Sequence, residues 1–348
     1  MKRVSSILLL LFLLTACLAT NIPATPALLS PALSSPLPTE TISPIAILAT
    51  QVPSLTATTD PYYFYTIDYL LTRSYGGGRI DFYEEVGKNN LFTRYFFRYP
   101  SDGLNIYGFA DIPNAEGSHP VVIALHGYID PAAYNTFDYT SHYADALAGA
   151  GYIVLHPNLR GYQPSDDGDN LFRVGMATDV LNLIALIQTQ SGGNDPLKNA
   201  NPNLIGLWGH SMGGGITTRV LTVSHAVKAA VLYAAMSGDE QKNYEAIRGW
   251  SGSTRGLAEA DVPVAALDRI SPMHFFENIT AAISIHHGLA DQLVPVEWSQ
   301  LTCDQLTALG KNVECHYYEN MPHTFTGTGD AQFIQNTIQF FDQYLNTP

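Results

Sequence analysis

One serine is flanked by glycines in the segment GHSMG, residues 209–213. The apolar residues LIGLW before it are typical of a strand, and ITTRVL after it can form a helix. At a sharp strand-to-helix turn, flanking glycines let the backbone bend so that the Ser211 hydroxyl is exposed for attack on a carbonyl carbon. A tight turn without chemistry would use the same glycines, so the motif needs a base and an acid to support it.

An acid and a base follow Ser211 in the chain, each just after an apolar strand. Asp291 lies in ISIHHGLADQLVP and His323 in YYENMPHTF. A serine hydroxyl is a weak nucleophile until a histidine accepts its proton, and a carboxylate holds that histidine in one tautomer. The chain order Ser211, Asp291, His323 is that of α/β-hydrolases. The alternatives are a surface Asp291, a structural His323, or other acids and bases that lack the chain order or the strand-end position: Asp239, Asp261, Asp268, His287 and His316.

Two backbone amides are needed to bind the negative oxygen of a tetrahedral intermediate. One should be the amide of Met212, the residue after the nucleophile. The second should come from the loop after PVVIALHGY, and we assign it to Tyr128. We expect His126 to pack under this loop rather than to act in catalysis. The pattern implies no metal and no organic cofactor.

Strand and helix patterns alternate from residue 116 to 348, as in PVVIALHG, HYADALAGAG and YIVLHPN. This alternation predicts an α/β protein with a mostly parallel central sheet and helices on both faces, and the order of the three catalytic residues makes it the α/β-hydrolase fold. Residues 61–115 predict a short helix and antiparallel opening strands, two of them joined by the turn SDG. Residues 236–279 interrupt the alternation, and we expect a small cap insertion there, over the carboxyl ends of the strands.

The amino-terminal segment MKRVSSILLLLFLLTAC has two cations, an apolar run and then small residues before Cys17. The run is too short to span a bilayer, which needs about 20 apolar residues, so residues 1–17 predict a signal peptide. LTAC resembles the lipobox of bacterial lipoproteins, which implies a lipidated Cys17 and an extracytoplasmic protein anchored to the cell membrane. The alternative is a chance cysteine after an ordinary signal peptide. Residues 18–60, rich in Pro, Thr, Ser and Ala, predict a tether or, alternatively, a flap packed on the domain.

The formal net charge of the chain is −14, from 17 Lys and Arg against 31 Asp and Glu. Nucleic acid and anionic lipid surfaces attract the opposite charge. We therefore expect no nucleic-acid partner, and membrane contact through the amino-terminal anchor only.

Cys303 and Cys315 are the two cysteines that remain if Cys17 is lipidated. Export places them where disulfides persist. Cys303 lies in the expected helix after the acid, and Cys315 lies in the strand that leads to His323. We therefore predict a disulfide that braces the element carrying the base. The alternative is a pair of buried thiols.

From about Tyr99 to Leu345 the chain resembles the catalytic domain of prolyl oligopeptidase-type serine hydrolases, which include dipeptidyl and acylaminoacyl peptidases. The segments that carry the resemblance occur in the family's order: YPSDGLNIYGF, GYIVLHPNLRGY, GLWGHSMGGG, HHGLADQLVPVEWSQ and YYENMPHTF. The resemblance implies Ser211 as nucleophile, Asp291 as acid and His323 as base. It also implies that the arginine in HPNLRGY, Arg160, steadies the loop beside the site.

Two departures from the family's pattern bear on the substrate. The family's peptidases usually carry a β-propeller that gates access, and the roughly 55 residues between the tether and the sheet are too few for one. Many of them also have a tyrosine where His126 stands. We therefore favour cleavage of a small carboxylic ester through an acyl-enzyme. The alternatives are a serine-type exo- or oligopeptidase acting on short peptides, and a catalytically silent binding lipoprotein.

Overall fold

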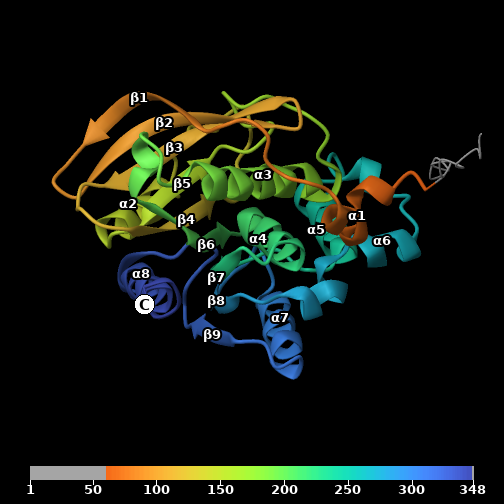
Figure 1. Cartoon of the computed structure of the whole chain (residues 1–348). Coiled ribbons are helices and arrows are strands. Elements are labelled where there is room, and N and C mark those ends of the chain that lie inside the picture. The colour runs from red at the N-terminus through yellow and green to blue at the C-terminus, as the bar shows by residue number, and fades with distance from the viewer. Residues whose placement is uncertain (1–59, 347–348) are drawn as a thin grey trace, which may run out of the picture. The chain divides into compact units, whose positions relative to one another are not determined.

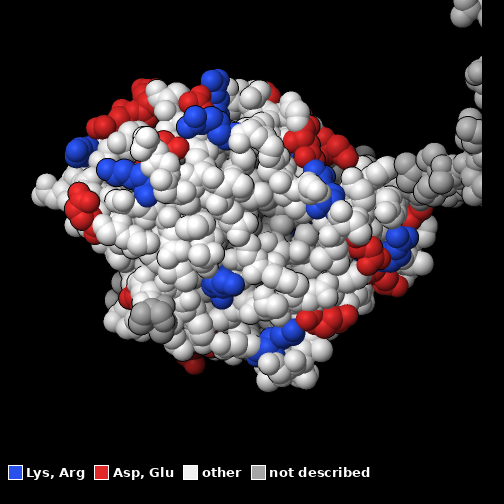
Figure 2. Space-filling view, in the orientation of Figure 1, with Lys and Arg blue, Asp and Glu red and all other residues white. Residues whose placement is uncertain are grey.

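The computed structural model describes residues 60–346 (Figure 1). The predicted signal peptide 1–17 with Cys17, and the predicted tether up to residue 59, lie outside the described residues. On the face of the molecule in Figure 2, basic and acidic side chains lie in small interspersed groups and most of the surface is uncharged.

The central sheet is mostly parallel, as the alternation of elements predicted. Its strands lie in the order β1-β2-β3-β5-β4-β6-β7-β8-β9. The opening strands pair antiparallel as far as the β3–β5 pair, and every pair from β5 to β9 along this order is parallel. The strands are β1 (Asp81–Lys88), β2 (Phe92–Ser101), β3 (Leu104–Pro113), β4 (His119–Leu125), β5 (Ile153–Pro157), β6 (Ala200–His210), β7 (Val227–Tyr233), β8 (Ala282–Gly288) and β9 (Val313–Tyr318).

Helices cover both faces of the sheet, again as predicted (Figure 1). The first face packs against α2 (Ser141–Gly149) and α8 (Gly327–Leu345), and the second against α3 (Val174–Gln190), α4 (Met212–Val223) and α7 (Val296–Ala308). The stretch from residue 171 to 190 is long and apolar enough to cross a membrane, but 78% of its most apolar window is buried, so it is a core helix of the domain.

Strand β4 explains why both faces must be covered, because all seven of its residues are buried. Its side chains alternate between two hydrophobic clusters. Val121 and Ile123 belong to the cluster under α3 and α4, and Val122 and Ala124 belong to the one under α2 and α8. A strand buried on both faces is typical of a parallel sheet sandwiched between helices.

The chain between β7 and β8 forms a helical cap instead of continuing the alternation. The cap consists of α5 (Glu240–Trp250), η4 (Leu257–Glu259), α6 (Val264–Ile270) and η5 (Pro272–Asn278). In Figure 1 the amino-terminal helix α1 (Ile67–Thr72) lies beside α6. Ile67 and Leu70 of α1 share a hydrophobic cluster with Leu267 of α6. The remaining short helices are η1 (Tyr63–Tyr65), η2 (Leu171–Arg173) and η3 (Pro196–Asn199).

Cys303 of α7 and Cys315 of β9 form a disulfide, with Cα atoms 6.5 Å apart. The bond joins the helix that follows Asp291 to the strand that precedes His323. The oxidation state of this pair in protein isolated from cells stays a prediction.

Candidate active site

Ser211 is the single residue between β6 and α4, and its backbone angles are φ 54° and ψ −113°. A positive φ is rare outside glycine and costs on the order of 1–3 kcal/mol. Backbone hydrogen bonds hold the turn, because the N–H of Ser211 donates to the carbonyl of Tyr233 at 2.9 Å and its own carbonyl accepts from Met236 N–H at 3.0 Å. The residue with the strained backbone is therefore Ser211, the same residue whose hydroxyl the motif requires to be exposed.

The glycines around Ser211 are required by close packing rather than by their own φ angles. A Cβ at Gly209 would lie 2.4 Å from the carbonyl oxygen of Gly213, and a Cβ at Gly213 would lie 2.3 Å from that of Leu125. Leu125 ends β4, next to β6 in the sheet. Glycine at 209 therefore lets β6 and α4 pack closely at the turn, and glycine at 213 lets α4 approach the neighbouring strand.

Asp291 lies between β8 and α7 with its side chain fully buried. Its Oδ1 accepts hydrogen bonds from the backbone N–H groups of Leu293 at 2.8 Å and Val294 at 3.0 Å. Its Oδ2 accepts from Nδ1 of His323 at 2.7 Å. Burial by itself raises the pKa of this carboxyl, but hydrogen bonds from His287 and His323 outweigh burial and hold the pKa of Asp291 well below its ordinary value.

His323 follows β9 and is held beside the nucleophile by the residue before Ser211. The carbonyl of His323 accepts a hydrogen bond from Nε2 of His210 at 3.0 Å, and the two imidazole rings lie 4.7 Å apart. Because Nδ1 of His323 donates to Asp291, Nε2 is the nitrogen left to accept a proton. No hydrogen bond joins Ser211 Oγ to His323 within residues 60–346, and we expect this contact to close when substrate binds.

His287 is a second histidine on the acid, and the sequence analysis considered it only as a rival base. Its Nε2 lies 3.1 Å from Oδ2 of Asp291 and 3.0 Å from the carbonyl oxygen of Val294. Two acceptors at this nitrogen require it to carry the proton, while Nδ1 accepts from the hydroxyl of Ser299 at 2.7 Å. His287 is therefore a fully buried donor that positions Asp291.

His210 and Tyr139 were missed by the sequence analysis. Tyr139 donates its hydroxyl hydrogen to Nδ1 of His210 at 2.6 Å, and the same oxygen accepts the N–H of Gly127 at 3.0 Å. Burial, reinforced by the neighbouring His323, lowers the pKa of His210 to about 3, so its ring is neutral. The only sequence signal for His210 is its place in the serine motif, and nothing local marks Tyr139.

The two predicted oxyanion donors, Met212 and Tyr128, both border the cavity at Ser211. Met212 is the first residue of α4, where backbone N–H groups have no partner within the helix. A Cβ at Gly127 would lie 3.2 Å from Cβ of Ser211, so this loop runs directly beside the nucleophile. The amide of Gly127 is already used by Tyr139, which leaves the next amide, that of Tyr128, without a partner among the described residues.

His126 and Arg160 are built into the walls of the site. His126 is fully buried beneath the loop, and its ring lies against those of Tyr134 and Tyr162 at 4.8 Å and 4.6 Å. Arg160 borders the cavity, but its guanidinium donates to both carboxylate oxygens of Asp179, at 2.7 Å and 3.1 Å. Because its donors are occupied, Arg160 supports the loop instead of offering a free charge to a substrate.

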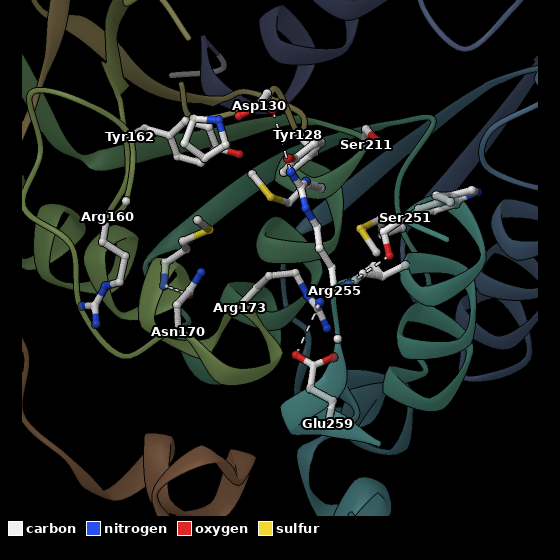
Figure 3. Close-up of a pocket in the computed structure, with 18 of the residues that line it drawn as sticks. Tyr128, Asp130, Arg160, Tyr162, Asn170, Arg173, Ser211, Ser251, Arg255 and Glu259 are labelled. Atoms are coloured by element: carbon white, nitrogen blue, oxygen red, sulfur yellow. Dashed lines mark hydrogen bonds and ion pairs between the residues drawn. The ribbon is translucent and has the colours of Figure 1, made fainter. Parts of the chain in front are cut away.

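A cavity of about 760 Å³ opens at Ser211 between the sheet and the cap (Figure 3). The apolar part of its wall is formed by Met176, Met212, Met236, Ile247 and Trp250. Arg173 and Glu259 line it as well, and Figure 3 draws this pair at the opposite end of the cavity from Ser211. An apolar pocket with a few placed polar groups is typical of a small-molecule site.

Two solved structures illustrate the fold. An acylaminoacyl peptidase of Pyrococcus horikoshii superposes with a TM-score of 0.60 at 22% identity, over 74% of this chain and 42% of that chain. An esterase of Pyrococcus furiosus superposes with a TM-score of 0.56 at 20% identity, over 75% of this chain and 99% of that chain. Likeness at this identity establishes the α/β-hydrolase fold and leaves the substrate open.

Sequence comparison identifies the family. The uncharacterised peptidase YuxL of Bacillus subtilis is 24% identical over 258 residues, which are 70% of this chain and 38% of YuxL. The chain therefore spans less than half the length of this relative. The sequence profile described as the prolyl oligopeptidase family matches residues 137–348. Because this match covers more than half of the chain, the protein belongs to the prolyl oligopeptidase family.

Proposed function

We propose that the protein cleaves a carboxylic ester through an acyl-enzyme intermediate. The observation that carries the proposal is the hydrogen bond of 2.7 Å between Asp291 and His323, set beside a strained Ser211. The amides of Met212 and Tyr128 border the same cavity and have no partner among the described residues. The nucleophile and the oxyanion donors thus line one space that a substrate can enter, and His210 holds His323 next to the nucleophile turn.

In this mechanism the Ser211 hydroxyl attacks the carbonyl carbon while Nε2 of His323 takes its proton. Asp291 keeps the other ring nitrogen protonated and stabilises the imidazolium that forms. The amides of Met212 and Tyr128 bind the oxyanion of the tetrahedral intermediate. His323 then gives its proton to the leaving alcohol, and the acyl group stays on Ser211 Oγ. Water, activated by His323, releases the acid and restores the serine.

The size of the cavity under the cap favours a small substrate. The cap is formed by the chain's own residues 240–278 and borders the cavity through Ile247, Trp250 and Glu259. A volume of about 760 Å³ lies in the range of pockets that enclose small molecules. In the described chain before the parallel strands, helix α1 and strands β1 to β3 stand where the family's peptidases usually carry a β-propeller.

A serine-type exo- or oligopeptidase is the second candidate, and family membership supports it as well as it supports an esterase. Amides and esters share the same acyl-enzyme chemistry, so the geometry of the catalytic residues does not separate them.

One experiment tests both candidates. Labelling with a fluorophosphonate, with Ser211→Ala as control, reports on the catalytic machinery. Turnover of short-chain p-nitrophenyl esters and of aminoacyl p-nitroanilides then reports on the substrate class. Faster turnover of the anilides would reject the ester proposal in favour of a peptidase. Absence of labelling in the parent protein would reject both enzyme functions and favour the catalytically silent binding lipoprotein.

We further propose that the enzyme acts outside the cytoplasm, anchored to the bacterial cell membrane through a lipid on Cys17. The proposal rests on the segment LTAC after a short apolar run. Its test is membrane fractionation of a Cys17 variant.

A further inference from the structure

One carboxylate oxygen in the wall of the catalytic cavity has no partner. Glu259 is only 7% exposed and lines the cavity from the cap. Its Oε1 accepts the backbone N–H of Phe172 at 2.9 Å and lies 3.8 Å from Nη1 of Arg173. Its Oε2 has no hydrogen-bond partner among the described residues. A buried carboxylate oxygen without a donor is unfavourable. Because Oε2 is itself buried while Glu259 borders the cavity, a donor on a ligand would satisfy this oxygen if the side chain turns toward the cavity.

The backbone next to Glu259 is strained. Phe172 and Arg173 have φ angles of 53° and 60°, two consecutive left-handed residues that are not glycine. Arg219 donates to the carbonyl of Phe172 at 3.4 Å, and Glu259 receives its amide hydrogen. Strain of this kind persists only where neighbours enforce it, and it gathers at ligand-binding sites. Bracing Phe172 requires only Oε1, so it does not account for the second oxygen.

The charges around Glu259 balance without a ligand. Arg173 donates to Glu240 and also faces Glu259, while Arg219 donates to Glu240. The two guanidinium groups therefore match the two carboxylates. A cationic ligand would add a third positive charge beside buried Arg173, which is costly where water is excluded. An uncharged donor leaves the balance intact.

We propose that Glu259 is a specificity-determining residue whose Oε2 accepts a hydrogen bond from an uncharged donor on the substrate. The donor is a hydroxyl or an amide N–H, placed on the part of the substrate that reaches the end of the cavity opposite Ser211. The proposal rests on the serine-hydrolase function proposed above. It adds that substrates lacking such a donor leave Oε2 unpaired and react more slowly.

Glu259→Gln is the informative variant, because it changes the free position and keeps the brace. It also removes one of the two carboxylates that balance Arg173 and Arg219, and a ratio between paired substrates in the same variant cancels that general effect. The amide oxygen of glutamine can keep the hydrogen bond from Phe172, which turns the NH₂ group toward the cavity. An acceptor thereby becomes a donor. Glu277→Gln makes the same chemical change at an exposed residue of the same cap and serves as the matched control.

The substrates are p-nitrophenyl alkanoates of increasing chain length, each paired with its ω-hydroxy derivative. A second series carries an N-acetylamino group in place of the hydroxyl, which distinguishes an amide donor from a hydroxyl donor. A third series carries an ammonium group. At the chain length that reaches Glu259, we expect kcat/KM for the hydroxy or acetylamino ester to exceed that of the plain ester by roughly 10- to 100-fold. In Glu259→Gln this ratio of kcat/KM values should fall to about 1, and in Glu277→Gln it should equal that of the parent protein.

Two results would overturn the proposal. One is a ratio that is the same in Glu259→Gln and in the parent protein at every chain length. The other is a preference for the ammonium series over both uncharged donors. A purely structural Glu259 would lower turnover of all series equally and so gives the first result. Fluorophosphonate labelling of each variant separates these outcomes from failure of the catalytic machinery, because a protein that is not labelled refutes the proposed function itself.

Discussion

Replacing Asp291 with asparagine tests the carboxylate that His287 and His323 both contact. The carboxylate accepts four N–H groups, those of His323 and His287 at Oδ2 and those of Leu293 and Val294 at Oδ1. Asparagine offers one oxygen. Whichever way its amide turns, two of the four donors therefore face an NH₂ group instead of an acceptor.

The magnitude of the effect follows from this count. If the amide oxygen stays with the two backbone N–H groups, the NH₂ group faces Nδ1 of His323, which must then become an acceptor. The ring proton moves to Nε2, and His323 can no longer take the proton of Ser211. In a serine protease triad this tautomer change lowers kcat roughly 10⁴-fold, or about 5.5 kcal/mol. His323 then pairs with the NH₂ group, and Nε2–H of His287 loses its contact with Oδ2 but keeps the carbonyl of Val294, so one lost contact predicts a loss of about 1–3 kcal/mol in the free energy of unfolding.

The assay is kcat with a short-chain p-nitrophenyl ester, together with urea denaturation of the same preparations. Asp268→Asn is the matched control, since that side chain is 58% exposed and lies in the cap, and it should leave both quantities unchanged. An Asp291→Asn protein that keeps kcat within tenfold of the parent would refute the assignment of Asp291 as the acid.

The remaining predictions concern the nucleophile, acid stability, the anchor and the disulfide. Ser211→Ala should abolish fluorophosphonate labelling and turnover while leaving the thermal midpoint near that of the parent, since the backbone strain remains; full activity would contradict the nucleophile assignment. Because the pKa of Asp291 is depressed in the folded protein, the unfolded state takes up the proton first as pH falls. The stability it contributes should be present above the unfolded carboxyl pKa of about 3.9 and lost as pH drops below it. Urea midpoints of the parent and of Asp291→Asn should therefore converge in acid, and a constant difference would count against this. Cys17→Ala should release the protein from membranes or leave it unprocessed, and normal processing with unchanged fractionation would remove the lipoprotein hypothesis. Peptide mass spectrometry without reduction should recover Cys303 and Cys315 linked, and two free thiols in exported protein would defeat the disulfide.

The main catalytic residues could be predicted because each is tied to a local pattern. Ser211 has its glycines, and Asp291 and His323 each follow an apolar strand whose carboxyl end must lie at one edge of a parallel sheet. The pair His286 and His287 marks the limit of such patterns. Neighbours in a strand point to opposite faces, so one of them had to face α7, but the alternation does not tell which.

Contacts between distant segments could not be predicted. Tyr139 reaches His210 across 71 residues, and Glu259 reaches Phe172 across 87 residues. No periodicity encodes such pairs, because they depend on how the loop before α2 and the cap settle against the sheet. The pairing of β3 with β5 could not be predicted for the same reason, since it requires the chain to skip one position in the sheet between β3 and β4 and to fill that position with β5.

The seating of α1 against the cap has a mechanical consequence. Asp60, the first described residue, pairs with Arg269 of α6 at 2.7 Å, and α1 then shares a hydrophobic cluster with the same helix. A pull on the chain from its amino-terminal side is thus delivered to the cap over the catalytic cavity and to α4, the helix that follows Ser211. A pull from the carboxyl end acts through α8, which packs on the sheet and not on the cap. The same enzyme immobilised by one end or by the other should therefore respond differently to flow or stretching, with turnover sensitive to load at the amino end.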